Sequence, residues 1–217
     1  MSDTDTGTGR VASGSRGAGS PPSPLARIAG PTALLAGLAI VVTQLVQLAT
    51  IDRDDKAAMF DNPVYVVNGI AQFVAFNLLL IALVALHRWQ DEQAGTFGVV
   101  ALVAALVGTL GLGGNYWFEA FVSPWAADAV PGYLDAEPAG VLLVGGASSY
   151  LLFAVGWVLF GWAALRAGVF PRAIAIALVV GGLVGIQMVQ PPLGVPLGLA
   201  LAWLGVWLLR SRRVAGR

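Results

Sequence analysis

The chain of 217 residues contains no cysteine, which excludes disulfides, thiolate metal sites and thiol catalysis. It contains a single histidine, His87, so any site that needs two imidazoles from one chain is also excluded. Charged residues are scarce, at 11% against about 25% in an average soluble domain. Basic and acidic residues number 12 each, so no excess of positive charge indicates a nucleic acid as partner.

Long hydrophobic runs, in contrast, are abundant, and 57% of the residues are hydrophobic. Six apolar segments each approach the ~20 residues that cross a ~30 Å hydrocarbon core. Lipid offers the backbone no hydrogen-bond partners, so we expect these segments to be helices. The sequence therefore predicts an all-α membrane protein, a transmembrane bundle of six helices at residues 32–51, 64–86, 98–120, 139–165, 170–190 and 193–209.

The last two spans are separated only by Pro191 and Pro192. A re-entrant hairpin at that point would reduce the count to five spans, and we favour six. Residues 1–31 are predicted to be a disordered cytoplasmic tail, because the first 24 are rich in Gly, Ser, Thr and Pro and offer little apolar surface to bury. Residues 32–209 form the predicted bundle, and residues 210–217 form a basic cytoplasmic tail.

The positions of the basic residues predict the orientation of the bundle. Ten of the twelve lie in the two tails and in the loops near residues 88 and 166–172, whereas only Arg53 and Lys56 lie in the opposite loops. Positive charge marks the cytoplasmic side of membrane proteins. We therefore expect both termini in the cytoplasm, and the acidic loops on the outer side.

An offset of 73 residues aligns the second and third spans with the fourth and fifth. Residues 94–97 (AGTF) match residues 167–170 (AGVF), and Trp89 matches Trp162. This pattern indicates an internal repeat of two-helix units. Gly95 and Gly168 would end helices in the left-handed conformation at the two equivalent turns.

Small residues recur every four positions on the fifth span and again on the sixth. Such stripes let helix backbones approach closely in lipid. They predict that these two helices pack against each other or across a homo-oligomer or membrane-protein partner. The accidental abundance of small residues is the alternative. The residues of the two stripes are Ala173, Ala177, Gly181, Gly185, Gly194, Gly198 and Ala202.

Polar side chains within the first three spans cluster in the predicted outer half of the bilayer. Such groups are costly in lipid and usually face the bundle interior. We expect them either to serve as hydrogen-bond glue between helices or to converge on one outward-facing ligand pocket. The candidate ligand-binding residues are Gln44, Gln47, Asn68, Gln72, Asn115 and Glu119.

Glu119 is the most informative of these residues. A carboxylate at the outer end of an apolar helix can bind a cation, relay a proton or anchor a basic group. It can equally lie at the membrane boundary in contact with water. Its aromatic neighbours, among them Trp117 and Trp125, are typical of an interfacial belt.

Three segments carry a resemblance: residues 115–125 (NYWFEAFVSPW), 85–95 (ALHRWQDEQAG) and 165–176 (LRAGVFPRAIAI). With them the chain, from Thr32 to Leu209, resembles an uncharacterised family of small multi-pass integral membrane proteins common in high-GC bacteria. The resemblance implies a bacterial inner (plasma) membrane protein and supplies no activity or catalytic residue.

From these observations the leading hypothesis is a non-enzymatic integral membrane protein that binds membrane lipids or a membrane partner. The alternative is a small transporter or ion-coupled permease that uses the polar pocket around Glu119. No catalytic residue, metal site or cofactor is predicted, because no paired acid–base set or ligand motif is present in the sequence.

Overall fold

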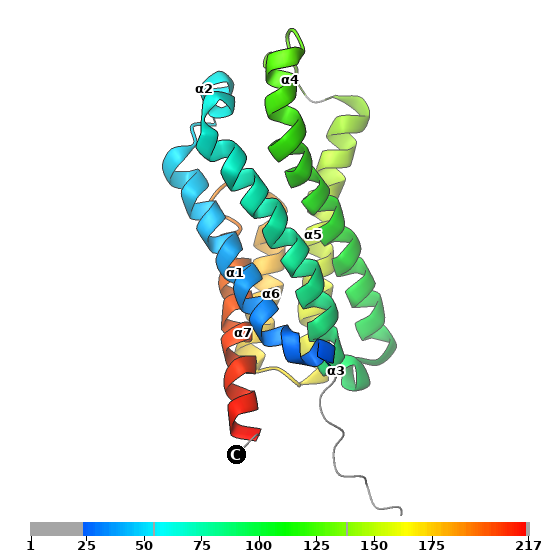
Figure 1. The fold of residues 1–217 in the computed structure, drawn as a ribbon. Coiled ribbons are helices and arrows are strands. Elements are labelled where there is room, and N and C mark those ends of the chain that lie inside the picture. The colour runs from blue at the N-terminus through cyan, green and yellow to red at the C-terminus, as the bar shows by residue number, and fades with distance from the viewer. Residues whose placement is uncertain (1–23, 54, 138, 216–217) are drawn as a thin grey trace, which may run out of the picture.

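The computed structural model describes residues 24–53, 55–137 and 139–215. Over these residues the chain is helical and contains no strand (Figure 1). The described residues also include a π-helix, Phe118–Val122, and a short 3₁₀ turn, Gly185–Gln187. The helices are α1 (Pro24–Thr50), α2 (Lys56–Asp61), α3 (Pro63–Trp117), α4 (Ser123–Ala129), α5 (Gly140–Ala167), α6 (Arg172–Val184) and α7 (Val195–Ala215).

Three helical segments are long and apolar enough to cross a membrane: α1, the continuous segment Pro63–Ala129, and α5. The segments Arg172–Gln187 and Val195–Ser211 are apolar but shorter. The all-α prediction is therefore confirmed over the described residues. By length and composition, the prediction of membrane-spanning helices holds for the three longer segments.

Two glycines reverse the chain at one end of the bundle. At Gly95 the backbone leaves the helical region (φ 55°, ψ −150°), so α3 consists of a first arm, residues 63–94, and an antiparallel second arm, residues 96–117. Gly168 ends α5 in the left-handed conformation (φ 66°) and its amide donates to the carbonyl of Ala164. The predicted left-handed conformation is confirmed for Gly168, whereas Gly95 has the positive φ that glycine permits but an extended ψ of −150°. Both turns lie at the end of the bundle where α1 starts and α7 finishes (Figure 1).

The first helix begins at Pro24, earlier than the predicted start at residue 32. Its first turns are ordered by packing, because Ala26 and Ala29 are buried and the carbonyl of Ala26 accepts a hydrogen bond from Trp89 Nε1 at 3.1 Å. Pro31 lies inside the helix, which bends near this point (Figure 1). The rest of the predicted tail, residues 1–23, lies outside the described residues.

The small residues of α7 pack mainly against α1. A Cβ added to Gly198 would lie 2.8 Å from the carbonyl oxygen of Gly37, and one added to Gly205 would lie 2.8 Å from the carbonyl oxygen of Gly30. Ala202 lies at the same contact, beside Gly37. The predicted pairing of the two stripes is thus replaced, for Gly198 and Ala202, by a close approach of α7 to α1 inside one chain.

The small residues of the α6 stripe lie in different surroundings. A Cβ added to Gly181 would lie 2.6 Å from the Cα of Leu197 on α7, so this part of the predicted α6–α7 contact is present. Gly185 instead faces the ring of Phe153 on α5. Ala177 is half-buried and Ala173 is exposed. Sequence periodicity identified the close-packing surfaces, but the partner of each was decided by the arrangement of the helices.

A column of buried aromatic rings fills the middle of the bundle. We call it the aromatic column and define it as Tyr116, Phe76, Phe153, Trp157 and Phe160, whose successive ring centroids lie 4.9, 5.6, 6.2 and 5.8 Å apart. All five side chains are at most 2% exposed. Thr109 Oγ1 accepts a hydrogen bond from the indole N–H of Trp157 at 3.1 Å, so this ring's polar atom is satisfied.

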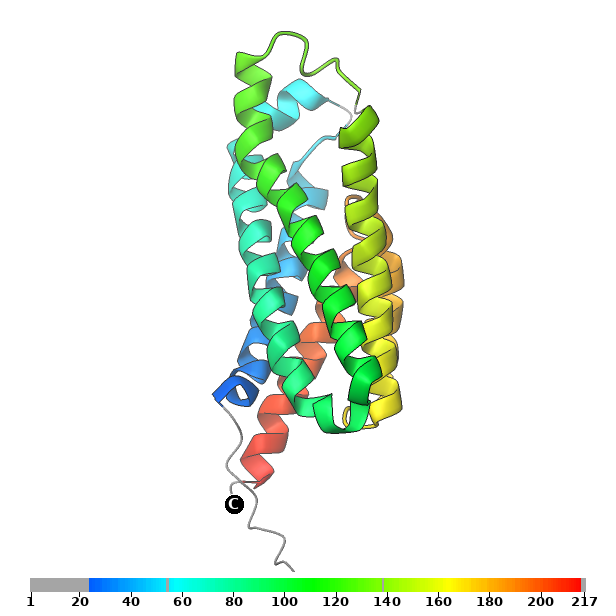
Figure 2. The ribbon, with the colours of Figure 1, turned by 90° about the vertical axis from the view of Figure 1, so that its right-hand side faces the viewer.

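The turn between α6 and α7 lies well below the start of α5 (Figure 2). The first part of α5 therefore lacks a neighbour on this side, and the buried residues of α5 begin only at Phe153. Val141 is 90% exposed, and the residues that follow it are exposed as well. As a result, this end of the bundle is less tightly packed than the end with the glycine turns.

Candidate functional site

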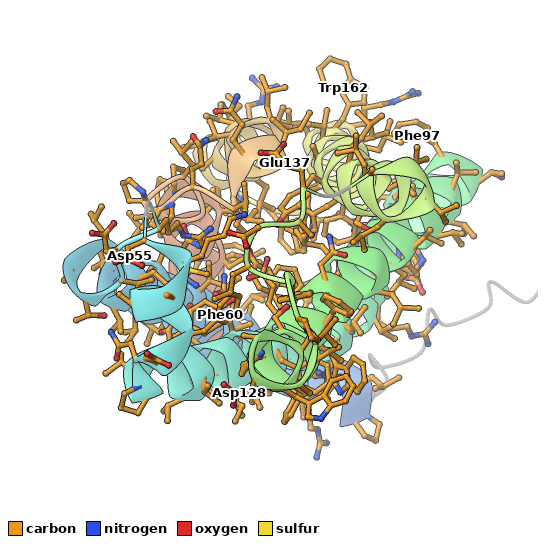
Figure 3. The ribbon with its side chains drawn as sticks, turned by 90° about the horizontal axis from the view of Figure 1, so that it is seen from above. Asp55, Phe60, Phe97, Asp128, Glu137 and Trp162 are labelled. Carbon is orange, nitrogen blue, oxygen red and sulfur yellow. The ribbon has the colours of Figure 1, made fainter. Side chains whose placement is uncertain are left out.

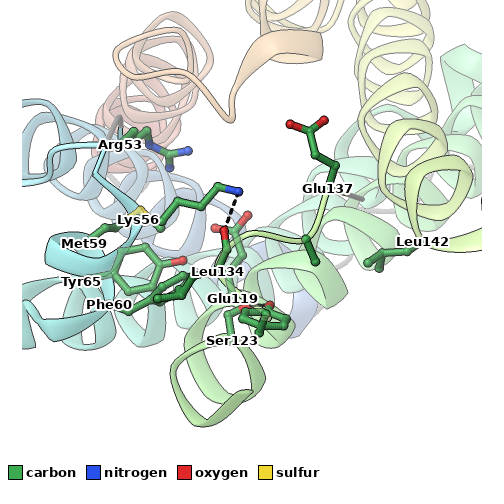
Figure 4. Close-up of a pocket in the computed structure, with 12 residues that line it drawn as sticks. Arg53, Lys56, Met59, Phe60, Tyr65, Glu119, Ser123, Leu134, Glu137 and Leu142 are labelled. Atoms are coloured by element: carbon green, nitrogen blue, oxygen red, sulfur yellow. Dashed lines mark hydrogen bonds between the residues drawn. The ribbon is translucent and has the colours of Figure 1, made fainter. Parts of the chain in front are cut away.

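A cavity of about 410 Å³ lies at the end of the bundle that carries α2 and α4 (Figures 3 and 4). Its volume is in the range of small-molecule sites, about 300–1,000 Å³. The lining comes from α2 and the residues before it, the start of α3, the π-helix, α4, the α4–α5 connection and the start of α5. The lining residues are Arg53, Lys56, Met59, Phe60, Tyr65, Glu119, Ser123, Tyr133, Leu134, Ala136, Glu137 and Leu142.

Two side-chain caps place α2 over this cavity. Asp55 accepts a hydrogen bond from the amide of Ala58 at 3.0 Å and so caps the start of α2. Asn62 caps α3 by accepting from the amide of Val64 at 2.9 Å, and its Nδ2 donates to the carbonyl of Thr50 at the end of α1. The connection from α1 to α3 is thus held by short local contacts.

The α4–α5 connection is attached to α2 and α4 by polar and aromatic contacts. Lys56 Nζ donates to the carbonyl of Leu134 at 3.0 Å (Figure 4), and Tyr133 Oη donates to Ser123 Oγ at 3.0 Å. The ring of Phe60 lies between those of Tyr65 and Tyr133, with centroid separations of 5.3 and 6.3 Å. These contacts form a roof across part of the cavity.

Charges of both signs line the cavity. Arg53 and Lys56 contribute two cations, and Glu119 and Glu137 contribute two carboxylates. Among the described residues, the ion pair closer than 4.0 Å joins Arg88 to Asp91, at the opposite end of the molecule, so no cation of the described chain neutralises Glu119 at that distance. The cavity therefore presents separate positive and negative groups to a ligand.

Glu119 is half-buried and belongs to the π-helix Phe118–Val122. A π-helical turn is rare and occurs frequently at functional sites, because the extra residue changes the direction of the side chains around it. Here it lies where the second arm of α3 passes into α4. The local irregularity thus coincides with the carboxylate that lines the cavity.

A chain of buried polar groups leads from Arg53 toward the core. Arg53 Nη2 donates to Gln47 Oε1 at 3.4 Å, and Gln47 Nε2 donates to Gln72 Oε1 at 3.2 Å. Gln72 is fully buried, and its Nε2 has no hydrogen-bond partner among the described residues. The same holds for the buried atoms Arg53 Nε and Tyr116 Oη. Buried polar atoms are normally paired, so these donors have capacity for water or a ligand.

The structure distributes the six predicted site residues among several environments. Of the six, Glu119 lines the cavity. Gln47 and Gln72 are connected by hydrogen bonds to Arg53, which also lines the cavity. Gln44 bonds instead to the α6–α7 turn, to Met188 and Gly194. Two further residues lie apart from this chain: Asn68, which is buried beside an apolar groove between α1 and α3, and Asn115, which is half-buried.

The predicted site residues thus differ in their surroundings. Gln44 joins α1 to the α6–α7 turn, whereas Glu119 lines a cavity. Sequence reasoning missed the roof residues and both cations. One signal could have identified the cations: Arg53 and Lys56 are the two basic residues outside the predicted cytoplasmic segments, and both line the cavity.

Among the described residues there is no group of three or more His, Asp or Glu side chains placed to hold a metal ion. The comparisons with protein-family models, curated proteins and solved structures found no match to this chain.

Proposed function

We propose that this chain is a multi-pass protein of a bacterial inner membrane, with six spans and both termini in the cytoplasm. The two arms of α3, with the shorter helices α6 and α7, supply the spans beyond α1 and α5. The arrangement of basic residues supports the orientation. Arg88, Arg166 and Arg172 lie beside the glycine turns, whereas Arg53 lies at the cavity end. The cavity then faces the outer side.

The role that this geometry supports best is the binding of a membrane lipid, without catalysis. The observation that carries it is the cavity itself, which combines separated charges of both signs with an apolar wall at Leu142. Ligand sites in general are mostly apolar, with a few polar groups that orient the ligand. A lipid headgroup at the membrane surface matches this combination.

The aromatic column favours binding over passage. Below Tyr116 the bundle is filled by Phe76, Phe153 and Trp157, which are buried and in ring contact. The polar chain from Arg53 reaches as far as Gln72. Among the described residues, the polar chain from the cavity therefore ends at Gln72, and buried aromatic rings lie between Tyr116 and the glycine turns.

The test is native mass spectrometry of the protein gently extracted from its own membrane. We expect a retained lipid on the unmodified protein and a lower bound fraction on Arg53→Gln. The matched control is Arg210→Gln, which removes a charge from an exposed residue of α7. A protein free of bound lipid, or equal retention by Arg53→Gln and the control, would contradict the proposal.

A transporter is the second candidate, and the buried chain Arg53–Gln47–Gln72 favours it. Alternating access would have to expose this chain to the cytoplasmic side. A single cysteine at position 72 distinguishes the two functions, since the natural chain has none. For a transporter, an impermeant thiol reagent should reach Gln72→Cys from either face. For a lipid-binding protein, the reagent should not reach the residue from the cytoplasmic face, since Gln72 is fully buried in this conformation.

A further inference from the structure

The charges of the cavity specify a ligand class more narrowly than lipid in general. Arg53 and Lys56 are brought to one cavity although they are the two basic residues outside the predicted cytoplasmic segments. Arg53 Nε is buried and has no hydrogen-bond partner among the described residues, and Lys56 donates one hydrogen bond, to the carbonyl of Leu134. Guanidinium and ammonium groups with donors to spare suit a phosphate, which accepts several hydrogen bonds at once.

The carboxylates supply the complementary half of the site. Glu119 has no cation of the described chain within 4.0 Å, and Glu137 is exposed at the cavity margin (Figure 4). Each carboxylate oxygen accepts hydrogen bonds, so a primary ammonium group would satisfy these residues directly. A quaternary ammonium group has no N–H donor. It would rely on the faces of aromatic rings, but Phe60 already contacts two other rings.

The start of α5 forms an apolar wall of the cavity that could contact the apolar part of a ligand. Leu142 lines the cavity and is also 58% exposed, and Leu143 and Val144 beside it are 55% and 67% exposed. Because the α6–α7 turn lies below this level (Figure 2), the apolar surface begins at the cavity and continues along the outside of α5. A headgroup in the cavity would therefore leave its acyl chains against the first turns of α5.

We propose that the cavity binds a zwitterionic phospholipid that carries a primary amine. The phosphate lies toward Arg53 and Lys56, the ammonium group toward Glu119 and Glu137, and the acyl chains along the start of α5. This inference rests on the proposed lipid-binding function and names the headgroup class. Charge complementarity selects the lipid, because an anionic headgroup would leave the carboxylates without a partner and would be repelled by them.

The experiment uses the full chain, purified and delipidated in detergent micelles. Phosphatidylethanolamine, phosphatidylglycerol and phosphatidylcholine with identical dioleoyl chains are added separately at equal concentration, and the bound fraction is measured by native mass spectrometry. We expect phosphatidylethanolamine to bind on the order of ten-fold more tightly than the other two lipids, the equivalent of about 1.4 kcal/mol. Glu119→Gln should abolish this preference, because the neutral amide does not attract the ammonium group.

Asp128→Asn is the matched control, since it removes a carboxylate from an exposed residue of α4 that does not line the cavity. We expect it to keep the preference. The lipid series on the unmodified protein is informative even if Glu119→Gln fails to fold. Soluble phosphoethanolamine serves as a competitor and should displace the lipid only weakly, because it lacks the chains that contact α5.

The outcomes separate the two proposals. Preferred binding of phosphatidylglycerol or phosphatidylcholine would overturn the primary-amine class and leave the lipid-binding function intact. Displacement by phosphoethanolamine at equal concentration would overturn the role of α5 and indicate a site for a free phosphate ester. The absence of any bound lipid would overturn both the class and the proposed function.

Discussion

The side-chain carbonyl oxygen of Gln44 accepts a hydrogen bond from the backbone amide of Gly194 at 3.0 Å. Its Nε2 donates to the carbonyl of Met188 at 3.1 Å, on the other side of the same turn. Gln44 is fully buried. One amide of α1 therefore holds both sides of the α6–α7 turn, at a level below the start of α5. The first part of α5, beside the cavity, is exposed because the turn lies at this level.

Replacing Gln44 by leucine should destabilise the protein. The substitution leaves a buried amide of Gly194 and a buried carbonyl of Met188 without their partner, at about 1–3 kcal/mol for each group. The free energy of unfolding of the purified protein in mixed micelles, titrated with a denaturing detergent, measures the effect. Gln93→Leu is the control because Gln93 is exposed. Equal stability of the two variants would refute the role assigned to Gln44.

Gly198→Ala should lower the stability of the protein, since the added Cβ would lie 2.8 Å from the carbonyl oxygen of Gly37 and α1 would have to move away. We expect a loss of about 1–3 kcal/mol from overpacking. Gly145→Ala is the comparison, because a Cβ at that position meets nothing within 4 Å. It should be neutral, or stabilising by up to about 1 kcal/mol through helix propensity. The thermal unfolding temperatures of the two variants, measured in the same detergent, test this prediction.

Thr109→Val tests the polar contact inside the aromatic column. Valine has nearly the same shape as threonine but accepts no hydrogen bond, so the buried indole N–H of Trp157 loses its partner. We expect a loss of about 1–3 kcal/mol in the free energy of unfolding. Thr50→Val serves as the control, since Thr50 is exposed and its hydroxyl bonds only to its own helix, at Val46. A Thr109→Val variant as stable as the control would show that the bond contributes nothing.

The absence of cysteine makes the orientation directly testable, because each introduced cysteine is the only thiol in the chain. Asp128 and Gln93 are both exposed and lie at opposite ends of the bundle, on α4 and near Gly95. In intact cells, a membrane-impermeant maleimide should label Asp128→Cys, and it should label Gln93→Cys only after lysis. The reverse pattern would invert the proposed topology. Labelling of both in intact cells would place the two residues on the same side of the membrane and would contradict the single span, the second arm of α3, between them.

Several features of the fold could be predicted because they depend on local chemistry. Gly95 and Gly168 each lie between two predicted helical segments, and only glycine adopts a positive φ at no steric cost, so the positions of the two turns could be predicted from the residues alone. The start of α1 could not be placed in the same way. Residues 24–31 become helical because Ala26 contacts Trp89, a residue far along the chain.

The candidate site shows the same division. The sequence indicated polar residues at one end of the bundle, but it could not distinguish the functions of two neighbouring amides. Gln44 and Gln47 lie on adjacent turns of α1, yet one bonds to the α6–α7 turn and the other bonds to Gln72 and Arg53. The π-helix at Glu119 was also beyond prediction, since it carries no composition signal that we recognised.

The sequence by itself determined the helical class, the apolar segments, the glycine turns and the charge asymmetry of the two ends. These follow from composition, length and backbone sterics, which act within a few residues of chain. Only the tertiary structure decided that α7 packs on α1, that the α6–α7 turn lies below the start of α5, and that Arg53 and Glu119 line one cavity. Those features depend on which helix surfaces pack together between residues far apart in sequence. Several helices have similar apolar compositions, so composition alone does not identify the packing partner of each surface.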